Sequence, residues 1–204
     1  MIIGLTGESG AGKSTVAKFL EMYGFFIIDC DAISRTLDTD KEYIARVEAE
    51  FGPQAISFAG GMKRINRKAL GAMLFGKDAR EGAVAKLNSI SHPIIIAKVH
   101  EEIAMAKAAQ KSAVIDAPLL FESGLDKICD VTVGVTAPLE ARIARLCARD
   151  GISADMALKR FANQKNESFL RANCTHVISN DGDSESLASR VLSVTEKITK
   201  GSKQ

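Results

Sequence analysis

Residues 7–14 near the N-terminus match the phosphate-loop pattern G-x-x-x-x-G-K-[ST] without interruption; they read Gly7-Glu8-Ser9-Gly10-Ala11-Gly12-Lys13-Ser14. This loop constrains the fold because it joins a buried strand to the first turn of a helix whose N-terminus faces an anion. The apolar run over residues 2–6 and the helical periodicity over residues 14–20 supply that context. The segment therefore predicts a phosphate-binding unit of strand, loop and helix, rather than a glycine-rich turn without a ligand.

The loop also predicts a role for each of its later residues. Its backbone N–H groups are expected to surround phosphate oxygens, while the Lys13 ammonium reaches the outer phosphates. The Ser14 hydroxyl is expected to bind Mg²⁺, which is the cofactor we predict for this chain. We assign nucleotide binding to Gly10, Ala11, Gly12, Lys13, Ser14 and Thr15.

Composition excludes several other classes of protein. The 204 residues, with 46% hydrophobic and 25% charged side chains, suit a single domain with insertions. A net charge of +2 is too small to indicate nucleic acid or membrane as the main partner. The four cysteines are scattered without zinc-ligand spacing, and the first strand begins too early for a signal peptide. We expect a cytoplasmic protein that is a monomer or a weak homo-oligomer.

Five short runs rich in Val and Ile predict a parallel sheet covered on both faces, because their apolar residues mostly do not alternate with polar ones. Helical patterns separate these runs, which places the chain in the α/β class. The predicted strands are residues 2–6, 25–29, 113–116, 131–136 and 176–179.

The long gap between the second and third predicted strands is unusual, since one crossover needs far fewer residues. It reads as a helical insertion that could form a second wall over the phosphate loop. Helical spacing covers residues 41–51, 68–75, 80–90 and 93–109, and His92 before Pro93 predicts a helix boundary. A later stretch, residues 138–163, predicts two helices separated at residues 150–153, with Ser153 as the N-cap of the second.

Acidic residues follow two of the predicted strands. In an open α/β sheet, ligands bind beyond the carboxyl ends of the strands, where Asp29 and Asp31 lie. Asp31 lies further beyond the strand and is the better candidate for a base that accepts a hydroxyl proton; the alternative is that it caps the next helix. Asp116 ends another apolar strand, as does the aspartate that holds Mg²⁺ in phosphate-loop enzymes.

Arg142, Arg145 and Arg149 lie on one face of a predicted helix at spacings i, i+3 and i+7. They are either a lid that clamps a transferring phosphoryl group or a solvated basic face. A GTPase switch is disfavoured because the nearest string to its N-K-x-D element, residues 163–166, lacks the final acid.

Beyond the loop, the chain resembles the dephospho-coenzyme A kinase family over nearly its full length. Each motif is weak alone, but their order is specific. They are Gly4-Leu5-Thr6-Gly7, Asp29-Cys30-Asp31 with Arg35, Phe51-Gly52, Asn66-Arg67 with Leu70, Leu87-Asn88 with His92-Pro93, Asp116-Ala117-Pro118-Leu119-Leu120-Phe121-Glu122, Arg145-Leu146 with Arg149-Asp150-Gly151, Arg160 and Gln164, and Ile178-Ser179-Asn180-Asp181-Gly182.

The resemblance implies a P-loop kinase-type three-layer α/β fold with a five-stranded parallel sheet, a helical substrate-binding insertion and a lid. It implies one domain with a core at about residues 1–31, 110–137 and 173–199, a coenzyme-binding insertion at 32–109 and a lid at 138–172. The implied reaction is transfer of the γ-phosphoryl group of ATP to the ribose 3′-hydroxyl of dephospho-coenzyme A. The resemblance implies that Asp31, Lys13 and Arg145 act in catalysis, and that Arg149 and Asn180 bind ATP. It implies that Ser14 and Asp116 hold Mg²⁺. The residues implied to bind the acceptor are Asp29, Arg67, His92 and Pro118.

The chain departs from the family pattern at three places. Glu8-Ser9 replaces the usual Gly-Ile, and the added charge costs little if Glu8 points outward. Cys30 replaces the usual Ala, and Cys174-Thr175-His176 replaces the usual Ala-Asp before the last strand. Two alternatives stay open: another phosphate-loop kinase acting on a nucleoside monophosphate or a sugar acid, and a non-catalytic ATP-binding regulator.

Overall fold

The computed structural model describes residues 1–76, 79–162 and 164–201. Contacts divide the chain into two compact units, Met1–Ile28 with Glu102–Gln204, and Asp29–Glu101. The second unit covers most of the insertion expected at residues 32–109. It begins three residues before the expected start and ends eight residues before the expected end. The assignment of that insertion to coenzyme binding, and of residues 138–172 to a lid, stays a prediction.

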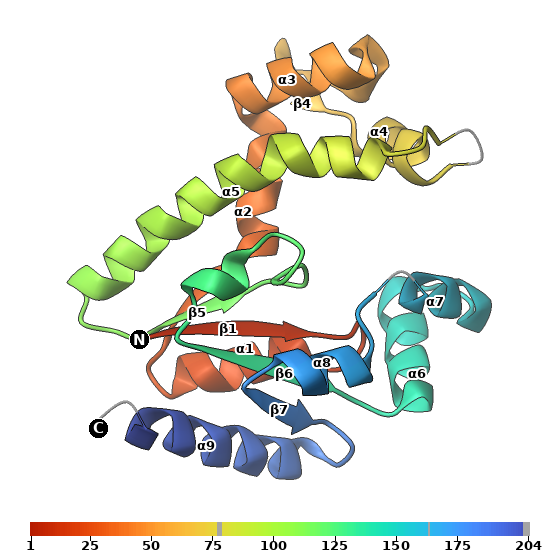
Figure 1. Cartoon of the computed structure of the whole chain (residues 1–204). Helices are drawn as coiled ribbons and strands as arrows, with labels where there is room; N and C mark the ends of the chain where they lie inside the picture. The colour runs from red at the N-terminus through yellow and green to blue at the C-terminus, as the bar shows by residue number, and fades with distance from the viewer. Residues whose placement is uncertain (77–78, 163, 202–204) are drawn as a thin grey trace. The chain divides into compact units, whose positions relative to one another are not determined.

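A five-stranded sheet forms the centre of the first unit, with the strand order β2-β5-β1-β6-β7 (Figure 1). β1 pairs in parallel with β5 and β6, and β6 pairs in parallel with β7. All five predicted strands are present within one residue of their expected bounds, so the predicted α/β class with a parallel sheet is confirmed. The strands are β1 (Ile2–Gly7), β2 (Phe26–Asp29), β5 (Ala113–Asp116), β6 (Val131–Thr136) and β7 (His176–Ser179).

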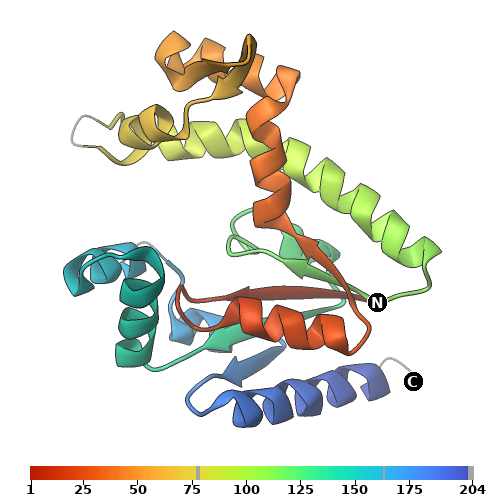
Figure 2. The same cartoon turned by 180° about the vertical axis from the view of Figure 1, so that it is seen from behind.

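Helices cover both faces of this sheet, which is why its strands are apolar on both sides. α1 (Lys13–Met22) and α9 (Ser184–Gly201) lie together on one face, and α8 (Glu167–Asn173) lies on the other with the short helix η3 (Leu125–Ile128) (Figures 1 and 2). Strand and helix side chains meet in one apolar core that includes Ile3, Leu5, Val16, Val133, Val135 and Val191.

The predicted pair of helices after β6 is confirmed as α6 (Leu139–Asp150) and α7 (Ala154–Phe161). The predicted cap is present as well, because the Ser153 hydroxyl accepts a hydrogen bond from the backbone N–H of Met156 at 3.3 Å. α6 ends at Gly151, whose φ of 65° is the left-handed conformation that commonly terminates helices. The sequence patterns did not predict α8.

The second unit is mainly helical and has its own core. Tyr43, Ile44 and Val47 of one helix meet Ile56, Ile65 and Leu70 from the elements that follow. Its elements are α2 (Cys30–Thr36), η1 (Leu37–Thr39), α3 (Lys41–Phe51), η2 (Pro53–Ala55), β3 (Ile56–Ala59), β4 (Met62–Ile65), α4 (Arg67–Phe75) and, up to residue 101, α5 (Ala83–Ala108).

The insertion was expected to consist of several helices, and the sequence analysis missed one element, because β3 and β4 form an antiparallel hairpin. Gly60 and Gly61 connect the strands, with φ angles of 59° and 76°. Two successive residues with positive φ make the hairpin turn whose twist matches the flanking strands. The Gly60-Gly61 pair was therefore the sequence signal for this hairpin.

The expected helix boundary at His92-Pro93 is also wrong, since α5 continues through Pro93. Proline removes one backbone donor from the helix. Apolar side chains on both sides of Pro93, including Leu87 and Ile94, pack against the core of this unit and hold the two halves in line. The helix therefore tolerates the missing hydrogen bond.

Candidate active site

The phosphate loop lies at the edge of the sheet where the parallel strands end. β1 runs directly into the loop, and the backbone N–H of Glu8 donates to the Val135 carbonyl of β6 at 3.2 Å. Asn180 follows β7, and its N–H donates to the carbonyl of Thr136, the last residue of β6, at 2.7 Å. Asp116 ends β5 at the same edge. This is the edge at which open α/β sheets bind ligands.

Side chains from distant segments hold three successive carbonyl groups of the loop. Arg142 Nε donates to the Ser9 carbonyl at 3.1 Å, and Arg145 Nη1 donates to the next carbonyl, that of Gly10, at 3.2 Å. Asn180 Nδ2 donates to the carbonyl of Ala11 at 2.8 Å. These bonds keep the carbonyl oxygens away from the space where an anion would lie.

The backbone donors of the loop are arranged in the opposite way. Within the described ranges, four N–H groups of the loop donate to no protein acceptor; they belong to Gly10, Gly12, Lys13 and Ser14. Successive free N–H groups at the start of a helix form an anion site. The loop therefore presents donors, with its carbonyls engaged elsewhere, as phosphate binding requires.

Two glycines of the loop are needed for its shape. Gly10 and Gly12 have φ angles of 79° and 96°, which side chains disfavour. A Cβ atom on Gly10 would lie 2.7 Å from the Arg142 carbonyl oxygen, and one on Gly12 would overlap Asn180 Nδ2. Both conformation and close approach therefore exclude larger residues here.

Lys13 and Asp116 form an ion pair at the start of α1. Asp116 is 8% exposed, so this carboxylate lies in a largely dry setting. Ser14 is exposed on the first turn of α1, and its hydroxyl has no hydrogen bond within the described ranges. A hydroxyl and a carboxylate are hard oxygen donors, which suit Mg²⁺ shared with substrate phosphates. The residues present therefore fit the expected metal.

The three arginines of α6 lie in different environments, and the buried Arg142 does not fit a wholly solvated basic face. Arg142 is buried: its Nη1 donates to Glu8 Oε1 at 2.7 Å, and its guanidinium lies over the Phe161 ring of α7. Glu8 therefore does not point outward; it is buried against Arg142. Burial raises the pKa of Glu8, and Arg142 acts in the opposite direction.

The other two arginines are more accessible. Arg145 is half-buried and contacts the loop carbonyl of Gly10. Arg149 is exposed and pairs with Asp150, which also binds Arg160 of α7. Hydrogen bonds from Arg149, and then from Arg160, lower the pKa of Asp150 to about 2. The carboxylate thus stays ionised and links the two arginines at neutral pH.

The sequence analysis did not assign one further side chain that contacts the loop. Gln164 entered the sequence analysis only as part of the family pattern, yet its side chain makes two hydrogen bonds with Ser9. The Ser9 N–H donates to Oε1 at 3.1 Å, and Nε2 donates to the Ser9 hydroxyl at 2.7 Å. These residues are 155 positions apart, so no local spacing could have indicated the pair.

In the second unit, the structure corrects the local description of the acid pair. β2 ends at Asp29, and α2 begins at Cys30, so Asp31 lies in the first turn of a helix. Asp29 is the residue that caps α2, accepting from the N–H of Ala32 at 2.8 Å. Its carboxylate also lies 3.7 Å from Arg35. The cap expected as the alternative role of Asp31 therefore belongs to Asp29, and the Asp31 side chain is exposed.

The remaining predicted acceptor residues occupy three different settings. Arg67 Nε donates to Asp38 at 2.6 Å on the surface of the second unit. His92 is half-buried within α5. Pro118 follows Asp116 in the first unit, and its carbonyl accepts from the Thr6 hydroxyl at 3.3 Å. Their roles toward a substrate stay predictions.

Comparisons with known proteins agree with the site. The sequence model of the dephospho-CoA kinase family matches residues 1–186. A dephospho-CoA kinase from Latilactobacillus sakei is 35% identical over 198 residues, covering 96% of this chain and 95% of its own. A second, from Deinococcus radiodurans, is 38% identical over 186 residues, covering 91% and 86%.

Solved structures show the same similarity. TT1252 from Thermus thermophilus has a TM-score of 0.82 at 32% identity, covering 97% of this chain and 96% of its own. Dephospho-CoA kinase from Campylobacter jejuni has a TM-score of 0.70 at 27% identity, covering 98% of both chains. The match to the family model includes the phosphate loop and the arginines of α6. The chain therefore belongs to the dephospho-CoA kinase family.

Proposed function

We propose that this chain transfers the γ-phosphoryl group of ATP to the ribose 3′-hydroxyl of dephospho-coenzyme A, giving coenzyme A and ADP. The observation that carries this proposal is the phosphate loop, whose carbonyls are held by side chains while four N–H groups stay available. Membership of the dephospho-CoA kinase family supplies the acceptor.

Three charged groups at the phosphate loop have proposed roles in this reaction. Lys13 exchanges its ion pair with Asp116 for the outer phosphates of ATP, and Arg145 faces the same loop from α6. Positive charge held in position stabilises the phosphoryl group during transfer, because the chemistry depends mainly on positioning and electrostatics. Ser14 and Asp116 would hold Mg²⁺, which neutralises phosphate charge when bound.

Asp31 is our candidate for the residue that accepts the proton of the 3′-hydroxyl. Its support is an exposed carboxylate in the first turn of α2, two residues after the end of β2. Asp29 is less suited to this task because its carboxylate caps the helix and lies near Arg35. Asp29, Arg67, His92 and Pro118 are proposed to contact the acceptor, and Arg149 and Asn180 the nucleotide.

The cellular setting forms part of the same proposal. Among the described residues, no helix could span a bilayer, and Cys30, Cys129, Cys147 and Cys174 form no disulfide bond. Cysteines outside disulfide bonds agree with the reducing cytoplasm, where we place the protein as a monomer or weak homo-oligomer.

An acceptor panel tests the reaction. ADP release would be measured with dephospho-coenzyme A, a nucleoside monophosphate, a sugar acid, and no acceptor. We expect release only with dephospho-coenzyme A. Activity with another acceptor would show a different phosphate-loop kinase, and ATP binding without transfer to any acceptor would show a regulator.

Asp31→Asn tests the proposed base. We expect ATP binding to stay unchanged while transfer falls by about 10²-fold or more, because the hydroxyl proton then has no acceptor. Asp40→Asn is a matched control, since Asp40 caps α3 through the N–H of Tyr43 and asparagine caps equally well. Transfer by Asp31→Asn at the rate of this control would remove Asp31 as the base.

A further inference from the structure

A buried ion pair connects the first half of the phosphate loop to α6. Glu8 and Arg142 lie 2.7 Å apart between Oε1 and Nη1, with side chains only 5% and 8% exposed. The same guanidinium donates through Nε to the Ser9 carbonyl and lies 4.1 Å from the centroid of the Phe161 ring. One arginine thus connects the loop, α6 and α7, although Glu8 and Arg142 are 134 positions apart.

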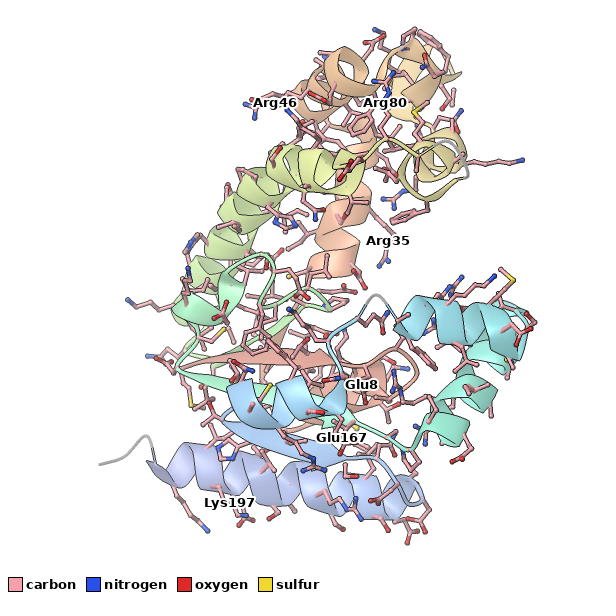
Figure 3. The ribbon with its side chains drawn as sticks, turned by 45° about the vertical axis from the view of Figure 1, so that its right-hand side comes forward. Glu8, Arg35, Arg46, Arg80, Glu167 and Lys197 are labelled. Carbon is pink, nitrogen blue, oxygen red and sulfur yellow. The ribbon has the colours of Figure 1, made fainter. Side chains whose placement is uncertain are left out.

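The negative charge of Glu8, which Arg142 balances, is unfavourable for an anionic ligand. Glu8 belongs to the loop that surrounds the phosphates, and the acidic Glu167 of α8 lies close to it (Figure 3). Among the described residues, Arg142 is the one side chain that forms an ion pair with Glu8. Charges interact strongly where water is excluded, so an unbalanced Glu8 would repel the phosphates.

The position of Arg142 separates its role from that of Arg145. Arg142 is enclosed by Glu8, the Ser9 carbonyl and the Phe161 ring, and this environment satisfies its charge within the protein. Arg145 is half-buried and has no acidic partner within the described ranges, so its charge is available to a ligand.

We propose that Arg142 is a positioning residue whose task is to neutralise Glu8, so that the loop presents N–H groups to a nucleotide without an opposing negative charge. The Ser9 carbonyl and the Phe161 ring hold the guanidinium in place for this task. The proposal rests on nucleotide binding by the loop, which belongs to the proposed function.

Three variants separate charge neutralisation from direct contact with phosphate: Glu8→Gln, Arg142→Gln and the double variant. ATP affinity would be measured by equilibrium titration, and thermal unfolding would be followed without ligand. We expect Arg142→Gln to weaken ATP binding by about tenfold or more, because Glu8 is then unbalanced. The double variant is expected to bind ATP clearly more tightly than Arg142→Gln, since no unbalanced charge is left, although it also lacks the bond from Arg142 Nε to the Ser9 carbonyl.

Other outcomes overturn the proposal. If Arg142 binds phosphate itself, or acts only by packing, the double variant stays as weak as Arg142→Gln. Unchanged ATP affinity in Arg142→Gln overturns it as well. If Arg142→Gln does not fold, Arg142→Lys takes its place: it keeps the charge but loses the bond from Nε to the Ser9 carbonyl, so a moderate loss of ATP affinity is expected, and a loss of about tenfold or more refutes neutralisation.

The same titration separates this proposal from the proposed function. Absence of ATP binding by the unaltered chain would refute the proposed function. Normal binding by the unaltered chain, combined with no rescue in the double variant, would refute only the role of the Glu8–Arg142 pair.

Discussion

Replacing Asn180 with alanine tests whether this residue supports the phosphate loop or contacts the nucleotide. Asn180 is 7% exposed, and its Nδ2 donates to the Ala11 carbonyl at 2.8 Å. Its removal leaves a buried carbonyl without a donor, which costs about 1–3 kcal/mol. A loss of about 2 kcal/mol in unfolding free energy lowers the Tm of a protein of this size by roughly 4–8 °C. ATP binding should weaken too, because the freed carbonyl can turn toward the phosphates.

The assay is thermal unfolding of the ligand-free protein, followed by titration with ATP. Asn173→Ala is the matched control: Asn173 Nδ2 also donates to a backbone carbonyl, that of Phe169 at 2.9 Å, but on the exposed surface. The control should change stability by no more than about 0.5 kcal/mol. If Asn180→Ala unfolds at the temperature of the unaltered chain and loses only ATP affinity, Asn180 acts through the proposed nucleotide contact alone, and our argument that its side chain also holds the loop is wrong.

Two further predictions concern charge and thiol chemistry. Arg145→Ala should lower turnover by about 10³-fold, far more than it weakens ATP binding in an equilibrium titration, because its charge acts mainly during transfer; equal losses in both would assign it to ground-state binding. Burial raises the pKa of Cys129 to about 12 and of Cys174 to about 11, so neither forms appreciable thiolate at pH 8. Mass spectrometry after iodoacetamide treatment should find both unmodified in the folded protein and alkylated after unfolding, and rapid alkylation of the folded chain would contradict the assigned burial.

The sheet could be predicted from sequence because each of its strands is a short apolar run that carries its own signal. Residues 113–116 and 131–136 were assigned with their observed bounds for this reason. The β3–β4 hairpin was missed because its exposed residues, such as Phe58 and Lys63, do not form an apolar run. Pro93 misled in the opposite direction, since tertiary packing on both sides outweighs the local preference of proline to end a helix.

The candidate site shows the same division between local and tertiary information. Lys13 and Ser14 were assigned from a pattern of eight consecutive residues. The ion-pair partner of Glu8 could not be assigned in that way, because the chain has many basic residues and no local pattern indicates which of them lies beside Glu8. From spacing alone, the sequence analysis gave Arg142 and Arg145 the same two alternatives, whereas the fold buries Arg142 and leaves Arg145 half-buried.

Phosphate binding by this loop is consequently a property of the whole first unit and not of the motif alone. A peptide with the sequence of the loop could turn its carbonyls toward an anion as readily as its N–H groups. Here the carbonyls of Ser9, Gly10 and Ala11 are each engaged by a side chain from α6 or from the turn after β7. Any movement of α6 that breaks the bonds from Arg142 and Arg145 would release the carbonyl oxygens of Ser9 and Gly10 toward the phosphates. The position of α6 and the affinity for nucleotide must therefore be coupled, in either direction, through the backbone of the loop.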